Sequence, residues 1–119
     1  MDICFEGVGQ VAATFKVDSS KAVLPGMAVT LTADGTVGLG SAGNMPCGVL
    51  LGGVRGGAAA VQISGVAKVG CSDAAPRVGW QTLACDGKGG VKTVTTGGLN
   101  CLVLAVDEDE TGKSVIVKL

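Results

Sequence analysis

The sequence predicts an all-β protein that folds as a small barrel or a two-sheet sandwich of about nine or ten short strands. Glycine occupies 21 of the 119 positions and interrupts nearly every window long enough for a helix. Short Val-rich segments alternate apolar and polar residues, which is the period of a strand with one buried face. The chain also contains an internal two-fold repeat, in which turns and strands follow one another in the same order twice.

The composition narrows the class of protein. A chain of 119 residues suits one compact domain. The net charge is −1 and no basic face is evident, so we expect no nucleic-acid binding. The apolar runs are far shorter than the ~20 residues that span a bilayer, so we expect no membrane insertion. The N-terminus lacks a basic segment followed by a long apolar one, and we expect no signal peptide.

The first predicted element is a segment outside the repeat, residues 1–22. Ala12–Val17 is predicted to be a strand, because Thr14, Phe15 and Val17 favour extended structure. Met1–Gln10 is predicted to be an extended arm that could add a strand to a partner's sheet edge. The remainder, residues 23–119, is predicted to be one β domain made of two similar halves.

The two halves cover about residues 25–65 and 78–119. An offset of 54 residues carries Cys47 onto Cys101 and Val49 onto Val103. Each half also contains an Asp-Gly pair after an alternating segment, which predicts a hairpin with a primed turn because such turns need positive φ. The matching positions are Asp34-Gly35 with Asp86-Gly87, Leu51 with Ala105, Val61 with Val115, and Ile63 with Val117.

The last strand of each half shows the clearest alternation. In the first half it predicts Ala59, Val61 and Ile63 on the buried face, with Gln62 and Ser64 opposite. Ser114–Lys118 alternates in the same way, with its valines on the buried face. The best helical candidate is one short turn around Cys71–Pro76.

Five cysteines are present, an odd number with no Cys-x-x-Cys spacing. We interpret them as free thiols that act as small hydrophobic side chains in a reducing cytoplasm. A zinc site is the alternative, but the chain has no histidine and no paired spacing, so no metal or cofactor is expected. The five are Cys4, Cys47, Cys71, Cys85 and Cys101.

Enzymatic chemistry is poorly supported. The absence of histidine excludes Cys–His and Ser–His–Asp arrangements, and we expect that the protein is not an enzyme. The acidic run Asp107–Glu110 is predicted to be a solvated hairpin turn completed by Thr111-Gly112, with a calcium loop or acid/base pair as the alternative. Gly52–Gly57 is predicted to be a hairpin connection rather than a phosphate loop, because a strand and not a helix follows it.

Seven residues are candidates for contact with a partner protein. Arg55 lies in the glycine-rich connection, where an exposed guanidinium can anchor a partner's carboxylate. Trp80, the only indole, either caps the end of the core or anchors a subunit interface. The other five belong to the predicted arm: Asp2, Ile3, Phe5, Glu6 and Gln10.

Several phrases of this sequence resemble, in order, those of a family of capsid decoration proteins of tailed bacteriophages and prophages. The early strand Ala12–Phe15 looks like the first of them, and Gly79-Trp80 falls in the later half of the pattern. The remaining phrases are Val23–Leu31, Asp34–Val37, Cys47–Leu50, Ala60–Val69 and Asp86–Lys92. The five cysteines depart from typical members of the family.

The resemblance implies a non-enzymatic structural protein on the exterior of the virion, made in the cytoplasm of the bacterial host. Such a subunit would bind the major capsid protein of an expanded shell as a homotrimer at local three-fold positions, and it would stabilise the head against internal DNA pressure. Two alternatives stay open: another virion accessory protein of the tail or fibre, or a small-ligand or carbohydrate-binding β domain. Carbohydrate sites usually present several aromatics, and this chain has three.

Overall fold

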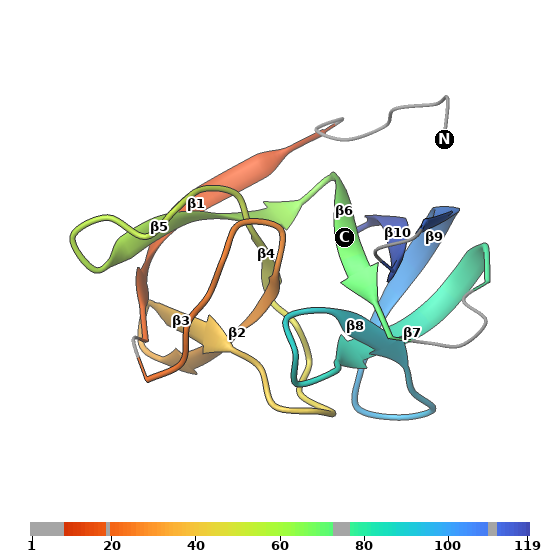
Figure 1. Ribbon diagram of the computed structural model, residues 1–119, viewed down its shortest axis with the longest axis horizontal. Coiled ribbons are helices and arrows are strands. Elements are labelled where there is room, and N and C mark those ends of the chain that lie inside the picture. The colour runs from red at the N-terminus through yellow and green to blue at the C-terminus, as the bar shows by residue number, and fades with distance from the viewer. Residues whose placement is uncertain (1–8, 19, 73–76, 110–111) are drawn as a thin grey trace.

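A computed structural model describes residues 9–18, 20–72, 77–109 and 112–119, which form ten strands and no helix (Figure 1). The predicted all-β class is confirmed, and so is the number of strands. The strands make two sheets of five, and each sheet closes into a small barrel.

The two barrels follow one another along the chain. The first contains β1 (Val11–Val17), β2 (Ala28–Ala33), β3 (Thr36–Leu39), β4 (Gly48–Leu50) and β5 (Ala58–Ser64), in the order β1-β3-β2-β4-β5. The second contains β6 (Val66–Cys71), β7 (Gly79–Cys85), β8 (Val91–Thr93), β9 (Leu99–Asp109) and β10 (Gly112–Lys118), in the order β10-β6-β8-β7-β9. Only Gly65 separates β5 from β6, so the barrels are joined by a single residue.

The strand pairing extends the predicted repeat by one strand. β1 pairs parallel with β3 and antiparallel with β5, and β6 pairs parallel with β8 and antiparallel with β10. β1 therefore holds in the first barrel the place that β6 holds in the second, although the sequence comparison left Val11–Val17 outside the repeat. The side chains differ at matching positions: Val61 pairs with Ala13 of β1, whereas Val115, its counterpart in the second half, pairs with Val69 of β6.

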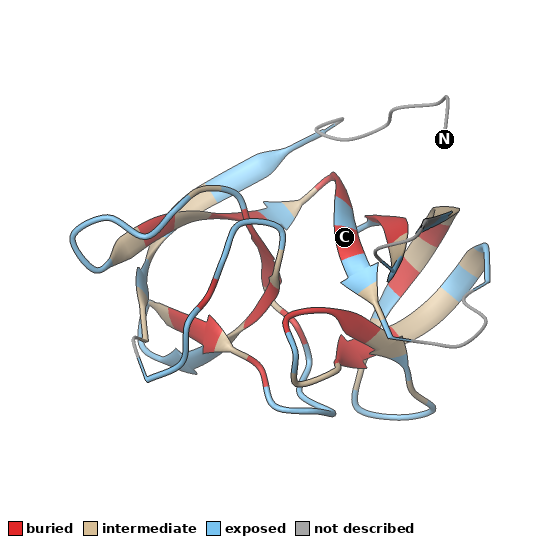
Figure 2. Ribbon diagram, viewed as in Figure 1, coloured by how far each residue is buried: buried red, intermediate tan, exposed pale blue. Residues whose placement is uncertain are grey.

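The apolar core consists of two clusters. Buried residues lie on the strands of both barrels (Figure 2). The first barrel buries a small cluster, with Phe15 packed against it: Val23, Val29, Val37, Leu50, Ala59 and Val61. The cluster of the second barrel also includes Ala28 and Val49 from β2 and β4 of the first. The barrels therefore share apolar contacts, and separating them would expose both residues to water.

The two Asp-Gly sequences form different turns. Asp34-Gly35 joins β2 to β3 as predicted, but only Gly35 has a positive φ (62°), so the turn is not the expected type I′. The ladder shifts register between Leu31 and Ala33, a bulge that lets a turn with one left-handed residue close the hairpin. Asp86 instead begins a longer loop, in which its Oδ1 accepts hydrogen bonds from the N–H groups of Lys88 (2.7 Å) and Gly90 (3.0 Å).

The predicted alternation in β5 holds at Ala59 and Val61 and then reverses. Ile63 is 40% exposed, whereas Gln62 is 2% exposed. Val11 pairs with Ser64 and the next residue, Ala12, pairs with Gln62, so Ile63 has no partner across the ladder. This bulge re-aims the side chains at the end of the strand. The prediction that placed Ile63 inside and Gln62 outside is therefore wrong.

The acidic run is not a turn over its whole length. β9 continues through Asp109 and β10 begins at Gly112, so residues 107–109 belong to a strand. Residues 110–111 lie outside the described residues, and so do residues 73–76 of the predicted helical turn. Cys71, the first residue of that predicted turn, is the last residue of β6.

Candidate interaction surfaces

Three of the seven predicted contact residues, Gln10, Arg55 and Trp80, lie within the described ranges. Asp2, Ile3, Phe5 and Glu6 lie outside them. The three described residues are not brought together: Gln10 lines a cavity between the barrels, Arg55 belongs to a loop of the first barrel, and Trp80 lies on β7 of the second.

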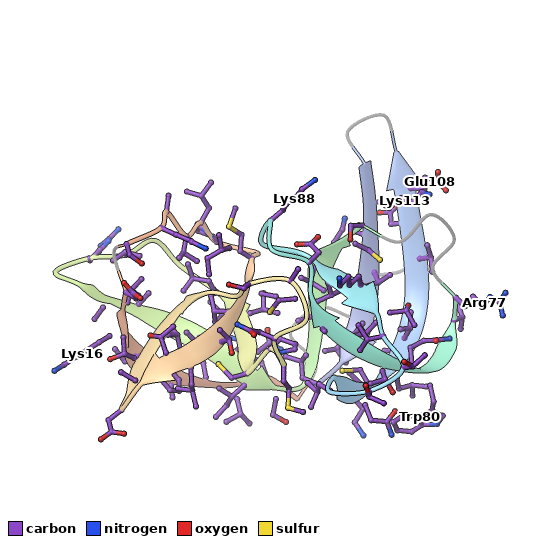
Figure 3. The ribbon with its side chains drawn as sticks, turned by 90° about the horizontal axis from the view of Figure 1, so that it is seen from below. Lys16, Arg77, Trp80, Lys88, Glu108 and Lys113 are labelled. Carbon is purple, nitrogen blue, oxygen red and sulfur yellow. The ribbon has the colours of Figure 1, made fainter. Side chains whose placement is uncertain are left out.

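Trp80 is 65% exposed, so the interpretation that it caps the core is wrong. Leu83 of β7 is buried, and Trp80, three residues earlier, has the opposite parity and therefore lies on the outer face of the barrel. Figure 3 shows its side chain projecting from the second barrel, away from the first. An indole held on a strand with most of its area in water is the kind of residue that anchors protein interfaces.

The neighbours of Trp80 enlarge this apolar surface. Trp80 pairs with the half-buried Leu102 of β9, and Val78, just before β7, is 64% exposed. Lys118 of β10 pairs with Leu102 on the other side and is exposed, so a cation borders the apolar residues. We call Val78, Trp80 and Leu102 the Trp80 face. The sequence analysis identified only Trp80, because cross-strand neighbours depend on a register that periodicity does not supply.

Arg55 begins the tip of the connection between β4 and β5. It bridges Ala58 through two backbone hydrogen bonds, N–H of Arg55 to O of Ala58 (2.8 Å) and N–H of Ala58 to O of Arg55 (3.1 Å). Gly56 and Gly57 between them both have positive φ, at 60° and 78°. The connection is a hairpin leading into a strand, which argues against a phosphate loop. The loop projects at the end of the first barrel far from the second (Figure 1).

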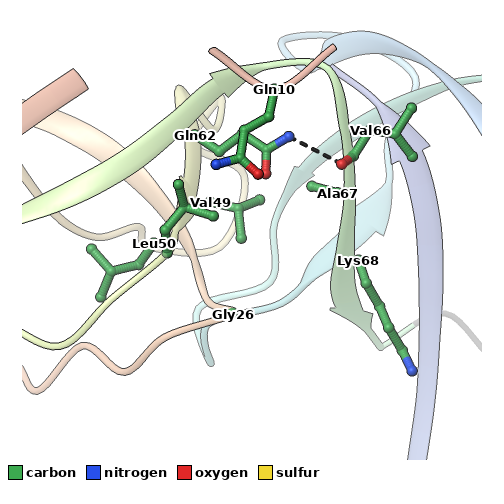
Figure 4. Close-up of a pocket in the computed structure, with 9 residues that line it drawn as sticks. Gln10, Gly26, Val49, Leu50, Gln62, Val66, Ala67 and Lys68 are labelled. Atoms are coloured by element: carbon green, nitrogen blue, oxygen red, sulfur yellow. Dashed lines mark hydrogen bonds between the residues drawn. The ribbon is translucent and has the colours of Figure 1, made fainter. Parts of the chain in front are cut away.

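Gln10 lines a cavity of about 210 Å³ between the barrels, beside Gln62, Leu50, Val66 and Lys68 (Figure 4). The buried Gln62 amide is already committed, because its Nε2 donates to the carbonyls of Ser64 (3.1 Å) and Val66 (3.0 Å). These bonds fix the chain where it passes from one barrel to the next. The cavity is smaller than usual ligand sites, which measure about 300–1,000 Å³.

A second hollow of about 380 Å³ lies where the loop 86–90 faces residues 25–27 of the first barrel, with Lys88 and Lys113 at its border (Figure 3). Its glycine-rich backbone could receive an anion. Two of the N–H groups in this loop, however, are already bonded to the Asp86 carboxylate. The protein's own side chain thus occupies the position that a bound anion would take.

The acidic residues of β9 form ion pairs. Asp107 accepts from Lys68 Nζ at 3.3 Å, and a Glu108 oxygen lies 3.9 Å from Lys113 Nζ (Figure 3). In residues 9–18, 20–72, 77–109 and 112–119, no three side chains of the metal-ligating types are grouped so that they could hold an ion. Glu108 and Lys113 lie opposite each other on the neighbouring strands β9 and β10, whereas the pair between Asp107 and Lys68 of β6 spans β10, which lies between β9 and β6.

The four described cysteines are free thiols. Cys85 and Cys101 are each 2% exposed, which confirms for them the prediction of buried thiols, whereas Cys47 and Cys71 are half-buried. Desolvation raises the pKa of Cys85 and of Cys101 to about 11, and it also raises that of Cys47. A higher pKa leaves less thiolate near neutral pH, so these thiols react more slowly there than an unperturbed cysteine would.

The described part of the chain contains no helix that is long and apolar enough to cross a membrane. No protein-family model matches the chain, and no curated protein matches it.

Proposed function

We propose that the protein is a non-enzymatic structural subunit that decorates and stabilises a phage capsid, through contacts with copies of itself and with the major capsid protein. The observation that carries this proposal is the Trp80 face. Trp80 and Val78 are each about two-thirds exposed, at 65% and 64%, on a rigid strand and its border. Large exposed apolar residues gathered at one place mark protein interaction sites.

The closed barrels suit a subunit that must be present at high concentration without aggregating. A strand at an open edge presents unpaired N–H and C=O groups to other chains, and closure removes such edges. Both sheets of the described chain are closed. Association is then left to side chains such as those of the Trp80 face, which can be specific for one partner.

The charge and the repeated geometry of a shell support the same proposal. A net charge of −1 gives little repulsion between copies. On a symmetric shell, several weak contacts act together and give strong overall binding. The resemblance to phage decoration proteins is the reason for proposing a capsid shell as the partner and the exterior of the virion as the location.

The direct test mixes the purified protein with expanded, DNA-free capsids of the encoding phage or prophage, followed by cryo-electron microscopy. Added density at local three-fold positions is the expected result, and unchanged capsids would contradict the proposal. Trp80→Ser should abolish the added density without unfolding the protein. The matched control is Leu24→Ser, because Leu24 is a comparably exposed apolar residue (59%) of the first barrel.

Self-association has a separate test. Sedimentation equilibrium of the free protein across a wide concentration range should give a species of three times the 11.6 kDa chain mass. If the trimer forms only on the shell, the density added to capsids should show three copies at each position. A monomeric mass at every concentration, together with monomeric density on capsids, would contradict the trimer.

The predicted arm can be tested by removing residues 1–8. Gly9 and Gln10 are kept because a Cβ on Gly65 would lie 2.5 Å from the Gly9 carbonyl oxygen, which shows how closely the two backbones pack. We expect shell binding to be lost while the circular dichroism spectrum and unfolding midpoint stay unchanged. Unchanged binding would refute the role of the arm.

A further inference from the structure

Two of the cysteines, Cys47 and Cys85, come from different barrels and lie on segments that run side by side where the barrels join. Cys47 directly precedes β4 of the first barrel, and Cys85 ends β7 of the second. Cys47 is half-buried against the first cluster of the core, whereas Cys85 belongs to the second. No role in the proposed capsid binding uses either thiol.

Backbone hydrogen bonds hold the two segments together. The N–H of Gly43 donates to the carbonyl of Cys85 (2.9 Å), and the N–H of Cys85 donates to the carbonyl of Asn44 (2.8 Å). The connection between β3 and β4 thus runs along the end of β7 like one more strand, beside the loop that leads to β8 (Figure 1). Cys47 follows three residues after Asn44.

The Cys85 thiol points toward the first barrel. A Cβ added at Gly40 would overlap Cys85 Sγ, so the absence of a side chain at position 40 leaves the room that this sulfur occupies. Charge on Cys47 also contributes to the raised pKa of Cys85, after desolvation and after the charge of Asp86. The Thr30 side chain lies between the two cysteines. Its Cγ2 is 3.5 Å from the same Cβ position at Gly40 that Cys85 Sγ overlaps, and because Val29 pairs with Gly48, Cys47 adjoins Thr30 on the neighbouring strand.

We propose that Cys47 and Cys85 form a redox site that a low-molecular-weight disulfide converts into a covalent link between the two barrels. The Cys47 thiolate attacks one sulfur of the small disulfide, which breaks that S–S bond and releases one small thiol. The Cys85 sulfur, losing its proton, then attacks the Cys47 sulfur and displaces the second small thiol. The protein loses two electrons and two protons, and the small disulfide gains them.

The difference in exposure sets the order of the two steps. A reagent can reach the half-buried Cys47, whereas Cys85 is only 2% exposed. Cys85 therefore reacts with the mixed disulfide on Cys47 and not with the reagent directly. The product would tie together two barrels that are joined along the chain by Gly65 alone. A link between positions 47 and 85 restricts the unfolded chain and should therefore raise the unfolding midpoint.

The sequence offers a clean experiment, because trypsin places the five cysteines in five different peptides: 1–16, 22–55, 69–77, 78–88 and 93–113. The reduced full-length protein is treated with glutathione disulfide, blocked with an alkylating reagent and digested without reduction. Mass spectrometry should find peptide 22–55 linked to peptide 78–88. The free-thiol count, measured in denaturant, should fall by two and recover fully with dithiothreitol.

Matched variants separate this site from general thiol chemistry. Cys101→Ala removes another buried thiol of the second barrel and should leave the 47–85 link and its yield unchanged. Cys47→Ser should abolish the link and the rise in unfolding midpoint, and because position 47 is half-buried this variant should fold. The same treatment in concentrated urea should give a mixture of linkages, since the native fold no longer selects the pair.

Three outcomes would overturn the proposal. They are glutathione retained on Cys47 as a mixed disulfide, a different cysteine pair in the folded protein, or a 47–85 link that forms no faster folded than unfolded. None of these outcomes bears on capsid binding, so the redox site can fail while the proposed function stands.

Discussion

The two barrels share one connectivity but differ in what they place on it. In the first barrel, β4 has only three residues, and it pairs with β2 at two positions. This part of the first barrel is therefore short. In the second, β9 has 11 residues and pairs with β7 over five positions, from Gly79↔Val103 to Leu83↔Leu99. The longer strands carry the Trp80 face. At the matching positions, the first barrel has Leu24 in place of Val78 but glycines, Gly26 and Gly48, in place of Trp80 and Leu102.

The comparison teaches that the pairing order and the inward side chains define this barrel, while strand length remains free to vary. The first barrel adds a glycine-rich loop with Arg55, and the second adds a long hairpin with two ion pairs and an apolar face. A duplicated scaffold can thus present different surfaces at its two ends. Four predictions test how far the halves depend on each other and on these additions.

The largest effect of a single substitution is expected where the barrels join. Gly65 has a φ of 95°, and a Cβ there would lie 2.5 Å from the Gly9 carbonyl oxygen and 2.8 Å from the Gln10 nitrogen. Gly65→Ala should therefore lower the free energy of unfolding by about 3 kcal/mol, measured by urea denaturation. Gly70→Ala is the control: a Cβ at Gly70 would meet no atom within 4 Å, and the change should be under about 0.5 kcal/mol. Equal effects would show that the join is not tightly packed.

Alkaline pH should weaken the second barrel in particular, because Cys85 and Cys101 lie there with pKa values raised from 9.0 to about 11. The unfolded chain then loses these protons before the folded one does. Stability should be unaffected below pH 9 and should fall between about pH 9 and 11, by about 2 kcal/mol per thiol.

The measurement compares urea denaturation at about pH 8 and about pH 10.5, in the wild type and in Cys101→Ala. The variant should lose roughly half as much stability between the two pH values as the wild type. An identical loss in both proteins would show that Cys101 does not contribute.

Gln62 ties β5 of the first barrel to the start of β6 in the second. Gln62→Ala removes its two hydrogen bonds to the Ser64 and Val66 carbonyls and should cost about 1.5 kcal/mol. The same change at Gln81, a half-buried glutamine of β7 with no side-chain hydrogen bond among the described residues, should cost under about 0.5 kcal/mol. If the two variants were equally stable, the tie would be dispensable.

The smallest effect concerns the ion pair between β6 and β9. Asp107→Asn should lower stability by about 0.5 kcal/mol, because Lys68 and Asp107 are partly exposed, with side-chain exposures of 40% and 24%. The difference from wild type should shrink in about 1 M salt, where charges are screened. Asp34→Asn, on the hairpin of the first barrel, should show no salt-dependent change, since Asp34 forms no ion pair within the described ranges.

The features that the sequence predicted correctly are those fixed by local chemistry. Glycine spacing, the buried positions of Val61 and Val115 and the Asp-Gly hairpin at Asp34 depend on residues nearby in the chain, and they led to the right class and number of strands. The strict alternation failed at Gln62 and Ile116, which are buried as well. The place of β1 in the repeat was missed because it depends on pairing with β3 and β5, which are distant in the chain. Ile63 was misplaced because a bulge depends on the partner strand.

The candidate sites show the same limit. The sequence could single out Trp80 as the only indole, but its exposure follows from the extra length of β7 and β9. Val78 and Leu102 became part of the same face only through the cross-strand register. The approach of the segments that carry Cys47 and Cys85 depends on contact between the barrels, which neither half of the repeat contains by itself.

One consequence of the join at Gly65 concerns engineering. The Gly9 backbone packs on Gly65 from one side, and the N–H of Leu119 donates to the Gly65 carbonyl at 2.8 Å from another. Polypeptides fused before residue 9 and after residue 119 would therefore leave the molecule from neighbouring points. A short linker could close the chain there and new ends could be opened in the loop around Gly53, which would give a circular permutant that displays cargo at the opposite pole.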